Sequence, residues 1–356
     1  MDYQIKKFSE LNDELKSVWL NIEKDSNHTC FNSLAWIENY ILSYKEYIES
    51  SELKIFVIFI KNRPVCIFPF EIIKRFKINI LQWACDMKSD FNAPLITRNF
   101  NFDEKMFTNV WEQILKMLPE VDIIYLKKQI NFLDSKNPFI SFLKNVKEGN
   151  IQQINLPKKW DNYTNTYLKK KFYLDLLRTK RLIKKNKKVE FLIAKNTEEK
   201  YFFLEKLIKQ KKEKLIKNKT IPLDEKDLNF YKNFEKFKNK QYSTQVSAIK
   251  LNGEFVAMHW GLVSKNYFYY LLPSMKDSDV KKLSPGKLLL SLLIRWSISK
   301  KINLFDFGLG EESYKKNWSN KTLKISNHLK LKKFRGIIFY TILKIREKIK
   351  LRKLDV

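Results

Sequence analysis

The sequence predicts an α/β (α+β) protein of two domains. Segments with helical and strand-like patterns alternate along the chain, which favours helices layered on sheets over a helix bundle. Two apolar runs around a polar turn occur in each half, at 53–74 and at 243–263, and this pattern is typical of a β-hairpin. The 356 residues, of which 44% are hydrophobic, allow a sizeable core and on size favour two domains over one.

The first half starts with a helix at 34–44, "LAWIENYILSY", followed by a hairpin whose turn is Lys61–Pro64. A strand at 78–85, a helix at 103–118 and a strand at 121–128 are expected next. Pro119 accounts for the end of that helix, because proline cannot continue a helical hydrogen-bond ladder.

The second half is helical in pattern from 157 to 182 and again, with many lysines, from 197 to 238. The second hairpin follows, then a strand at 266–275, a helix opening at Ser284 and a strand at 302–308. The recurrence of strand, tight turn and strand in both halves indicates two related domains in tandem.

The helix at Ser284 has a well-marked beginning. Serine suits the N-cap, Pro285 suits the first helical position, and Gly286 keeps side-chain bulk away from the helix mouth. Free N–H groups and the helix dipole can bind a phosphate or carboxylate there, and Lys281, Lys282 and Lys287 would add attraction. The alternative is a well-capped helix without a ligand.

The next strand runs into the segment "FDFGLGEESYKKNW", from Phe305 to Trp318. Asp306 lies between two phenylalanines on an expected central strand, where a carboxylate is either paired or functional. An ion pair with Lys315 or Arg295 is the structural alternative. Gly308 is expected to end the strand, and Gly310 to turn the chain back over it.

Residues 283–318, "LSPGKLLLSLLIRWSISKKINLFDFGLGEESYKKNW", resemble a signature of the BioF-like, cellulose-biosynthesis (CelD-type) branch of the GNAT superfamily of N-acetyltransferases. A weaker likeness covers about 160–320, and 31–74 resembles a degenerate N-terminal half. The tandem arrangement is also similar to that of the FemAB-type aminoacyl transferases. The resemblance implies a degenerate GNAT-like domain at 1–155 and a GNAT domain at 156–328, each a mixed, mostly antiparallel sheet flanked by helices.

In this family, acyl-CoA inserts between two splayed strands, here 266–275 and 302–308, with its pyrophosphate at the mouth of the intervening helix. The resemblance therefore implies acyl transfer from acyl-CoA, such as acetyl-CoA, to an amine on a sugar or cell-envelope polysaccharide precursor. The usual phosphate loop, Arg or Gln followed by Gly-x-Gly or Gly-x-Ala, is replaced by a segment with Gly286 alone. An aminoacyl-tRNA donor is the alternative within enzymes.

Acyl transfer requires a neutral amine, donors to the oxyanion and an acid for the leaving thiolate. His259 is the first candidate base and Asp306 the second, while packing or pairing would explain each without catalysis. Tyr270 and Tyr314 are candidate acids or positioning groups. The residues expected to bind the donor are Ser284, Gly286, Lys287 and Lys282. The residues expected to bind the acceptor are Glu311 and Lys315. No metal site is expected.

The net charge of +30 indicates a phosphate-bearing partner, or a codon bias that leaves a basic surface without one. The segment 329–356 gathers lysines, arginines and isoleucines, which predicts a basic amphipathic helix that lies on an anionic membrane or packs on the protein. The alternative hypothesis is a non-enzymatic protein that binds nucleic acid or a membrane surface. The sequence contains no segment that resembles a known nucleic-acid-binding motif.

The expected location is cytoplasmic, with peripheral attachment to the inner face of the membrane as an option. Three cysteines without a CxxC spacing indicate neither a disulfide framework nor a zinc site. The first 20 residues lack a signal-peptide pattern, and no apolar run reaches the roughly 20 residues that span a bilayer.

Overall fold

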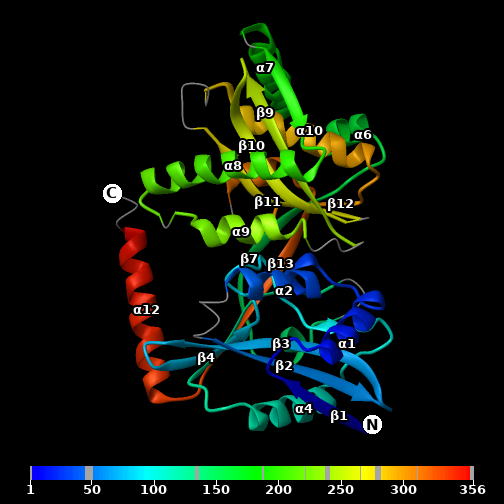
Figure 1. Cartoon of the computed structure of the whole chain (residues 1–356), viewed down its shortest axis with the longest axis vertical. Coiled ribbons are helices and arrows are strands. Elements are labelled where there is room, and N and C mark those ends of the chain that lie inside the picture. The colour runs from blue at the N-terminus through cyan, green and yellow to red at the C-terminus, as the bar shows by residue number, and fades with distance from the viewer. Residues whose placement is uncertain are drawn as a thin grey trace. The chain divides into compact units, whose positions relative to one another are not determined.

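The computed structural model describes residues 2–44, 51–132, 136–186, 188–220, 222–236, 241–264, 266–276, 282–310 and 312–352. The chain divides into two compact units. Unit 1 comprises Met1–Gly149 and Lys324–Val356, and unit 2 comprises Asn150–Leu323 (Figure 1). Each unit is described by itself.

Unit 1 is built on a sheet of order β1-β2-β3-β4-β6-β13, with the short β5 beside β3. The β4–β6 pair is parallel and the other neighbours are antiparallel. Its strands are β1 (Tyr3–Phe8), β2 (Ser51–Ile60), β3 (Arg63–Arg75), β4 (Ile78–Trp83), β5 (Leu95–Ile96), β6 (Ile123–Gln129) and β13 (Lys321–Leu331). Its helices are α1 (Asp13–Lys24), α2 (Leu34–Ser43), α4 (Glu104–Met117), α5 (Pro138–Phe142) and α12 (Phe334–Arg352), with a 3-10 turn at Cys30–Asn32.

Unit 2 has a sheet of order β7-β12-β11-β10-β9-β8, in which the β11–β12 pair is parallel and the others are antiparallel. Its strands are β7 (Val146–Asn155), β8 (Val189–Ile193), β9 (Ser243–Leu251), β10 (Glu254–Val263), β11 (Tyr267–Met275) and β12 (Leu304–Asp306). Its helices are α6 (Trp160–Thr166), α7 (Lys170–Asn186), α8 (Thr197–Lys217), α9 (Glu225–Asn233), α10 (Pro285–Ser299) and α11 (Ser313–Trp318).

The two units repeat one succession of elements. The order β1-α1-α2-β2-β3-β4-α4-β6 of unit 1 matches β8-α8-α9-β9-β10-β11-α10-β12 of unit 2, with the parallel pair at the same place. The predicted α/β class with two mixed, mostly antiparallel sheets is confirmed. The repeat extends well beyond the single hairpin visible in the sequence.

Both hairpin turns have backbones that fit their residues. Lys61 and Asn62 have φ of 48° and 62°, and Asn252 and Gly253 have φ of 52° and 86°. Two consecutive left-handed residues match the right-handed twist of the flanking strands, and asparagine and glycine adopt that conformation at little cost. The turn chemistry therefore sets the register of the strands that carry the site.

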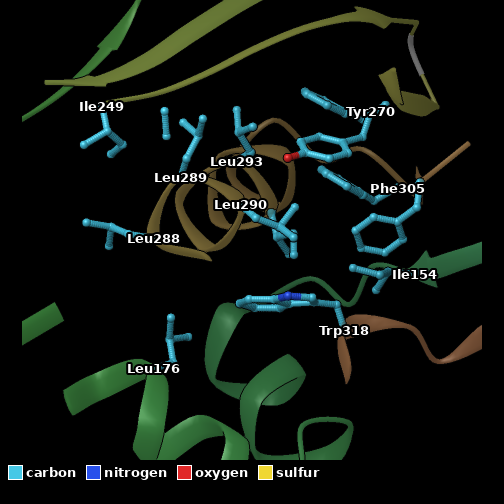
Figure 2. Packing of buried hydrophobic residues seen from close by; sticks show 14 of the residues in the cluster. Ile154, Leu176, Ile249, Tyr270, Leu288, Leu289, Leu290, Leu293, Phe305 and Trp318 are labelled. Atoms are coloured by element: carbon cyan, nitrogen blue, oxygen red, sulfur yellow. The ribbon is translucent and has the colours of Figure 1, made fainter. Parts of the chain in front are cut away.

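The core of unit 2 lies between its sheet and α10. Leu288, Leu289, Leu290 and Leu293 are buried on α10, and Figure 2 shows them between the strand residues and the Trp318 ring. Trp260, on the opposite face of the sheet, contacts Tyr231 and Phe234. The sheet of unit 2 is thus covered by α10 on one face and by α8 and α9 on the other.

The core of unit 1 is aromatic and centres on Phe139. Its ring lies 5.0–5.7 Å from five others, mostly edge-on, which is the favoured aromatic geometry. These are Phe68, Phe70, Trp83, Phe107 and Trp111.

The C-terminal segment begins as a strand, not as the helix expected from residue 329. β13 pairs with β6 as far as Leu331, and α12 starts at Phe334. The alternation of buried and exposed residues from Lys321 explains the strand, since a half-buried strand has a period of two. None of the helices in the described ranges is long and apolar enough to cross a membrane.

Gly261→Ala is expected to destabilise the protein by at least about 2 kcal/mol, because overfilling a packed interior forces side chains and backbone to shift. A Cβ atom at Gly261 would lie 2.2 Å from the Tyr269 carbonyl oxygen and 2.6 Å from His259 Cε1. Urea denaturation measures the loss. Gly286→Ala is the control: its Cβ would meet Met275 Sδ at 3.5 Å, so its free energy of unfolding should not fall. Equal stabilities of the two variants would contradict the packing argument.

Candidate functional site

The site begins where two parallel strands part. Tyr267–Tyr269 of β11 pair with Leu304–Asp306 of β12, and β11 then continues to Met275 paired only with β10 on its other side. No strand among the described residues lies beside the edge that β12 leaves. These are the two strands that the resemblance pointed to.

A cavity of about 690 Å³ lies along this unpaired part of β11. Its wall comes from β11, the first turns of α10, the segment after β12, one residue of α7 and two residues of α8. The lining residues are Phe172, Lys211, Lys214, Tyr270, Pro273, Ser274, Met275, Ser284, Gly286, Lys287, Leu289, Leu290, Glu312, Tyr314, Asn317 and Trp318. Five expected site residues therefore meet in one place: Tyr270, Ser284, Gly286, Lys287 and Tyr314.

The mouth of α10 opens into the cavity. The helix begins at Pro285 as expected, but Ser284 does not cap it with its side chain. Its backbone is left-handed, with φ of 51° and ψ of 52°, which directs the hydroxyl away from the N–H groups of the first turn. Gly286 leaves free space, since within the described residues only Met275 Sδ lies within 4 Å of an added Cβ.

The lysines around this mouth have different environments. Lys287 forms an ion pair with Asp175 and lies 4.5 Å from the centre of the Phe172 ring. The Lys287 ammonium lowers the pKa of the Asp175 carboxyl, mainly through their hydrogen bond. Lys282 is exposed and does not line the cavity. Lys281 lies outside the described residues.

The chain after β12 is held in a tight loop by a buried lysine. Lys315 Nζ donates to the Leu309 carbonyl oxygen at 2.7 Å and forms an ion pair with Glu312 Oε2 at 2.8 Å. Gly310 has a φ of 119°, and a Cβ there would lie 3.0 Å from Lys315 Nζ. These contacts return the chain over the cavity, and they give Lys315 a role within the loop. Glu311 lies outside the described residues.

Glu312 is a cavity residue that the sequence reasoning missed, although it lies in the quoted segment. Burial alone would raise the pKa of its carboxyl, but the nearby Lys315 and Lys211 outweigh burial and the pKa is lowered. Lys211, on α8, reaches the Pro273 carbonyl oxygen at 3.1 Å. It comes from a lysine-rich helix in which no local signal distinguishes it from its neighbours.

Two tyrosine hydroxyls face the cavity and stay protonated at neutral pH. Burial, reinforced by the negative charge of Glu312, raises the pKa of Tyr314 and that of Tyr270. Figure 2 shows the Tyr270 hydroxyl directed toward α10. Because both hydroxyls keep their protons, they can donate hydrogen bonds.

His259 lies next to this site but does not line the cavity. Its ring stacks on Tyr270 with centroids 4.3 Å apart and an interplanar angle of 4°. Nδ1 is 3.3 Å from Gln245 Oε1, and Nε2 has no hydrogen-bond partner among the described residues. Burial, and to a lesser extent Lys211, lowers the pKa of the imidazole well below its usual value. His259 is therefore a neutral side chain that supports Tyr270.

Asp306 points to the other face of the sheet from Phe305 and Phe307. Its Oδ2 accepts from Gln153 Nε2 at 2.6 Å, and its Oδ1 accepts from the Gly308 N–H at 2.7 Å. The side chain is 1% exposed and does not line the cavity. These bonds join β12 to β7 and fix the start of the loop.

Residues 170–316 match the model of the acetyltransferase (GNAT) domain family. Unit 2 carries a GNAT domain. The splayed strands and the helix mouth on the cavity lie within or directly beside this matched segment. No curated protein matches the chain.

Solved structures with a similar fold cover nearly the whole chain. The crystal structure of FemX has a TM-score of 0.58 at 9% identity, over 90% of this chain and 96% of FemX. The C-terminal domain of a putative lysylphosphatidylglycerol synthetase from Agrobacterium fabrum has a TM-score of 0.55 at 11% identity, over 93% and 95%. L-PGS from Bacillus licheniformis has a TM-score of 0.54 at 12% identity, over 95% and 97%. At these identities the likeness concerns the fold.

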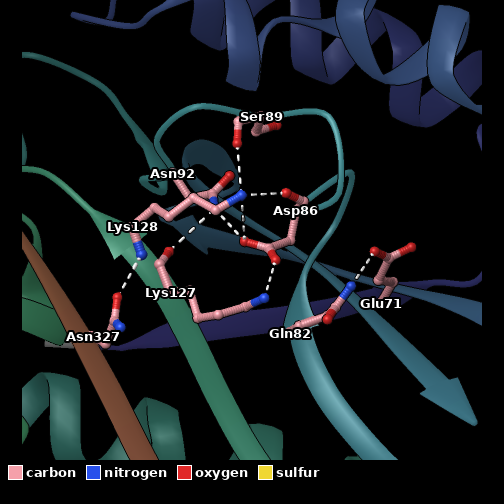
Figure 3. Close-up of polar contacts among 8 residues, drawn as sticks. All are labelled: Glu71, Gln82, Asp86, Ser89, Asn92, Lys127, Lys128 and Asn327. Atoms are coloured by element: carbon pink, nitrogen blue, oxygen red, sulfur yellow. Dashed lines mark hydrogen bonds and ion pairs between the residues drawn. The ribbon is translucent and has the colours of Figure 1, made fainter. Parts of the chain in front are cut away.

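The corresponding strands of unit 1 also part, but a loop of the same unit lies beside them (Figure 3). Asn92 bridges to Gln129 at the end of β6 and donates to Asp86 Oδ1 at 3.0 Å. Lys127 pairs with Asp86 Oδ2 at 2.6 Å, and the half-buried Lys128 Nζ donates to the Ser89 carbonyl oxygen at 2.8 Å. This network holds the loop where unit 2 has its cavity.

The helix that follows in unit 1 also differs at its beginning. Asp103 caps α4 by accepting from the Met106 N–H at 2.8 Å, and Glu104 occupies the first turn. Two carboxylates at this helix mouth satisfy its N–H groups and repel an anion. The unit 1 counterpart of α10 is therefore unsuited to a phosphate.

Within the described ranges, no group of three or more His, Cys, Asp or Glu side chains could hold a metal ion.

Replacement of His259 by Gln is expected to make the protein less sensitive to acid below pH 6.5. Because the folded state lowers the His259 pKa, the unfolded chain binds one more proton below its ordinary value of 6.5, so stability falls as the pH falls. The wild-type protein should lose about 1.4 kcal/mol more per pH unit than the variant over this range. Urea denaturation at several pH values measures both slopes.

Two buried acids change the pH dependence of stability in the opposite direction, so the wild type has to be compared with the variant. Burial raises the pKa of Glu23 and of Glu71 to about 7, so the folded state binds their protons more tightly than the unfolded chain. Their contribution to stability grows as the pH falls from 7 toward 4.5. It cancels in the difference between wild type and variant, and parallel slopes would refute a neutral buried His259.

Proposed function

We propose that the protein is an N-acyltransferase that moves an acyl group from acyl-CoA to an amine, with the cavity of unit 2 as its active site. The observation that carries this proposal is the cavity between β11 and the segment after β12, with the mouth of α10 in its wall. The GNAT domain match covers the strands and helix that form it. A thioester placed along the free edge of β11 would find backbone partners there and an anion site at α10.

The donor's pyrophosphate is assigned to the mouth of α10. The Gly286 N–H lies at the second position of the helix, before the first helical hydrogen bonds, and glycine lets a phosphate approach closely. The next two N–H groups, of Lys287 and Leu288, donate to the Ser284 carbonyl oxygen. Lys287, Lys211 and Lys214 line the same cavity and supply positive charge. Helix and cations together compensate for the missing Gly-x-Gly loop.

The chemistry is assigned to Tyr314, Tyr270 and Glu312. The ionised Glu312 draws the substrate ammonium into the cavity, and a proton passes from the amine to this carboxylate or to water. The neutral amine attacks the thioester carbon and the C–N bond forms. As the C–S bond breaks, the positively charged nitrogen loses a second proton to water, which leaves the amide. Tyr314 gives its proton to the leaving thiolate and regains one from water, and the Tyr270 hydroxyl donates to the oxyanion in the transition state. His259 and Asp306 act through their contacts with Tyr270 and the loop.

The acceptor is proposed to be an amine on a sugar or another cell-envelope precursor, handled in the cytoplasm, where acyl-CoA is made. The resemblance to the BioF-like and FemAB-type families supports this class of acceptor. One of the similar structures is named as a domain of a putative lysylphosphatidylglycerol synthetase, and lysylphosphatidylglycerol is a lipid. Unit 1, whose counterpart of the cavity is closed by its own loop, is proposed to bind no donor.

A second donor, aminoacyl-tRNA, is favoured by two observations. The similarity to FemX, to the putative lysylphosphatidylglycerol synthetase and to L-PGS extends over at least 90% of this chain. Lys211 and Lys214 give the cavity a basic edge that also suits the phosphates of a tRNA acceptor end. Both donors present an activated acyl carbon, so the same amine chemistry would follow.

Gly286→Val is expected to abolish donor binding without lowering the melting temperature of the free protein. The added methyl groups would occupy space at the helix mouth that the protein itself leaves open. Acetyl-CoA or a longer acyl-CoA at about one hundred times its Kd should stabilise the wild type by about 2.7 kcal/mol, and the variant should show no shift. A thermal melt with and without donor gives both values.

The control for this experiment is Lys282→Ala, which removes an exposed charge outside the cavity and should keep the full shift. A wild-type protein that ignores every acyl-CoA but is stabilised by aminoacyl-tRNA would reverse the choice of donor. Stabilisation by neither donor would contradict the proposed function.

Tyr314→Phe is expected to lower kcat about 100-fold, because loss of a general acid costs typically 10²- to 10⁴-fold in rate. The ring stays in place, so the donor-induced shift and the melting temperature should be unchanged. Release of free CoA thiol measures turnover. Tyr267→Phe is the matched control, since this tyrosine of β11 does not line the cavity. This substitution also removes one hydroxyl, and it should leave kcat unchanged. A fully active Tyr314→Phe would exclude Tyr314 as the acid.

A further inference from the structure

The helix α12 has two different faces, both belonging to unit 1. Gly336, Phe339, Tyr340 and Leu343 face the sheet, where Phe339 and Tyr340 pack on the cluster of Ile78, Ile80 and Ile123. A Cβ at Gly336 would lie 2.8 Å from the Asp122 carbonyl oxygen, so the helix lies very close to the strand there. Ion pairs of Arg335 with Asp122 and of Lys333 with Glu120 fasten its first turn.

The outward face of α12 is apolar. With about 100° between successive residues, its side chains fall within an arc of about 140° that is opposite to the packed face. They are 44–76% exposed, although four of them are isoleucines. This outward face consists of Phe334, Ile337, Ile338, Ile342 and Ile345. Thr341 lies within the same arc, and its hydroxyl donates to the Ile337 carbonyl oxygen at 2.9 Å.

Basic residues border the outward face. By the same helical geometry, Arg335 lies at one edge of the arc and Lys344 at the other. The tip of the β3–β4 hairpin adds Phe76, which is 74% exposed and whose ring lies 6.2 Å from that of Phe339. Lys74, Arg75 and Lys77 surround Phe76 and are all exposed.

We propose that this outward face of α12, together with the tip of the β3–β4 hairpin, docks on an anionic lipid surface. An apolar face that is bordered by cations allows a helix to lie at the boundary of head groups and acyl chains, while lysine and arginine reach the lipid phosphates. A second copy of the chain would bring like charges together at these edges, in a protein of net charge +30. Nucleic acid would satisfy the cations but not the isoleucines.

This inference does not depend on the acyltransferase chemistry, because its residues belong to unit 1 and the cavity belongs to unit 2. A membrane-bound amine acceptor would give such an attachment an evident use.

The test is co-sedimentation of the full chain with vesicles of phosphatidylglycerol and phosphatidylcholine, and with vesicles of phosphatidylcholine alone. The wild type should bind the anionic vesicles. The double variant Ile338→Glu with Ile342→Glu should partition at least about tenfold more weakly, because charged groups on the outward face oppose its insertion into the lipid. The matched control is Leu20→Glu with Leu42→Glu, which changes the same charge on exposed leucines of α1 and α2. This control should bind about as well as the wild type.

Three outcomes would overturn the proposal. Wild type that stays in the supernatant with anionic vesicles is the first, and equal weakening in both double variants is the second, since general charge would then explain binding. The third is a dimeric wild type that becomes monomeric in Ile338→Glu with Ile342→Glu, as measured by sedimentation velocity without lipid, because the face would then be covered by a second copy. If the double variant melts early, Ile345→Glu alone provides the same comparison near the end of the exposed face.

Discussion

The parting of β11 from β12 after three residue pairs is the feature on which the rest of the site depends. A strand edge without a neighbour exposes N–H and C=O groups that need partners. In unit 2 this edge faces a cavity, so a ligand can supply the partners. The α10 mouth and the returning loop are placed around the same gap, which brings the start of a helix and two protonated tyrosines to one cavity.

The repeat makes the role of that gap clear by comparison. Unit 1 has the same order of elements and the same single parallel pair, yet the segment after β4 bonds to β6 there. Asp86 is the centre of that closure, because it takes both Lys127 and Asn92. One topology thus supports an open site in one copy and a self-filled, structural core in the other.

The described side chains behind the cavity are arranged so that none of them buries an unpaired charge. His259 is fully buried and neutral, and its stacking on Tyr270 limits the directions that the tyrosine hydroxyl can take. The Lys315 ammonium is buried with a carbonyl oxygen and Glu312 as partners, because an unpaired buried charge would be far more costly. His259 and Lys315, which the sequence suggested as site residues, therefore support the groups that face the cavity.

The sequence by itself determined the local features: both hairpins and their turns, the start of α10, and the glycines of the segment after β12. Each depends on backbone preferences within a few residues, as for Asn252-Gly253 and Ser284-Pro285. It could not decide that Glu312 and Lys211 meet across the cavity, that Asp306 faces away from it, or that Ser284 leaves its helix uncapped. Those facts follow from strand pairing and packing between residues that are far apart in the chain, so only the tertiary structure decided them. The same holds for α12, where packing on the sheet covers Phe339 and Tyr340 and leaves the isoleucines exposed.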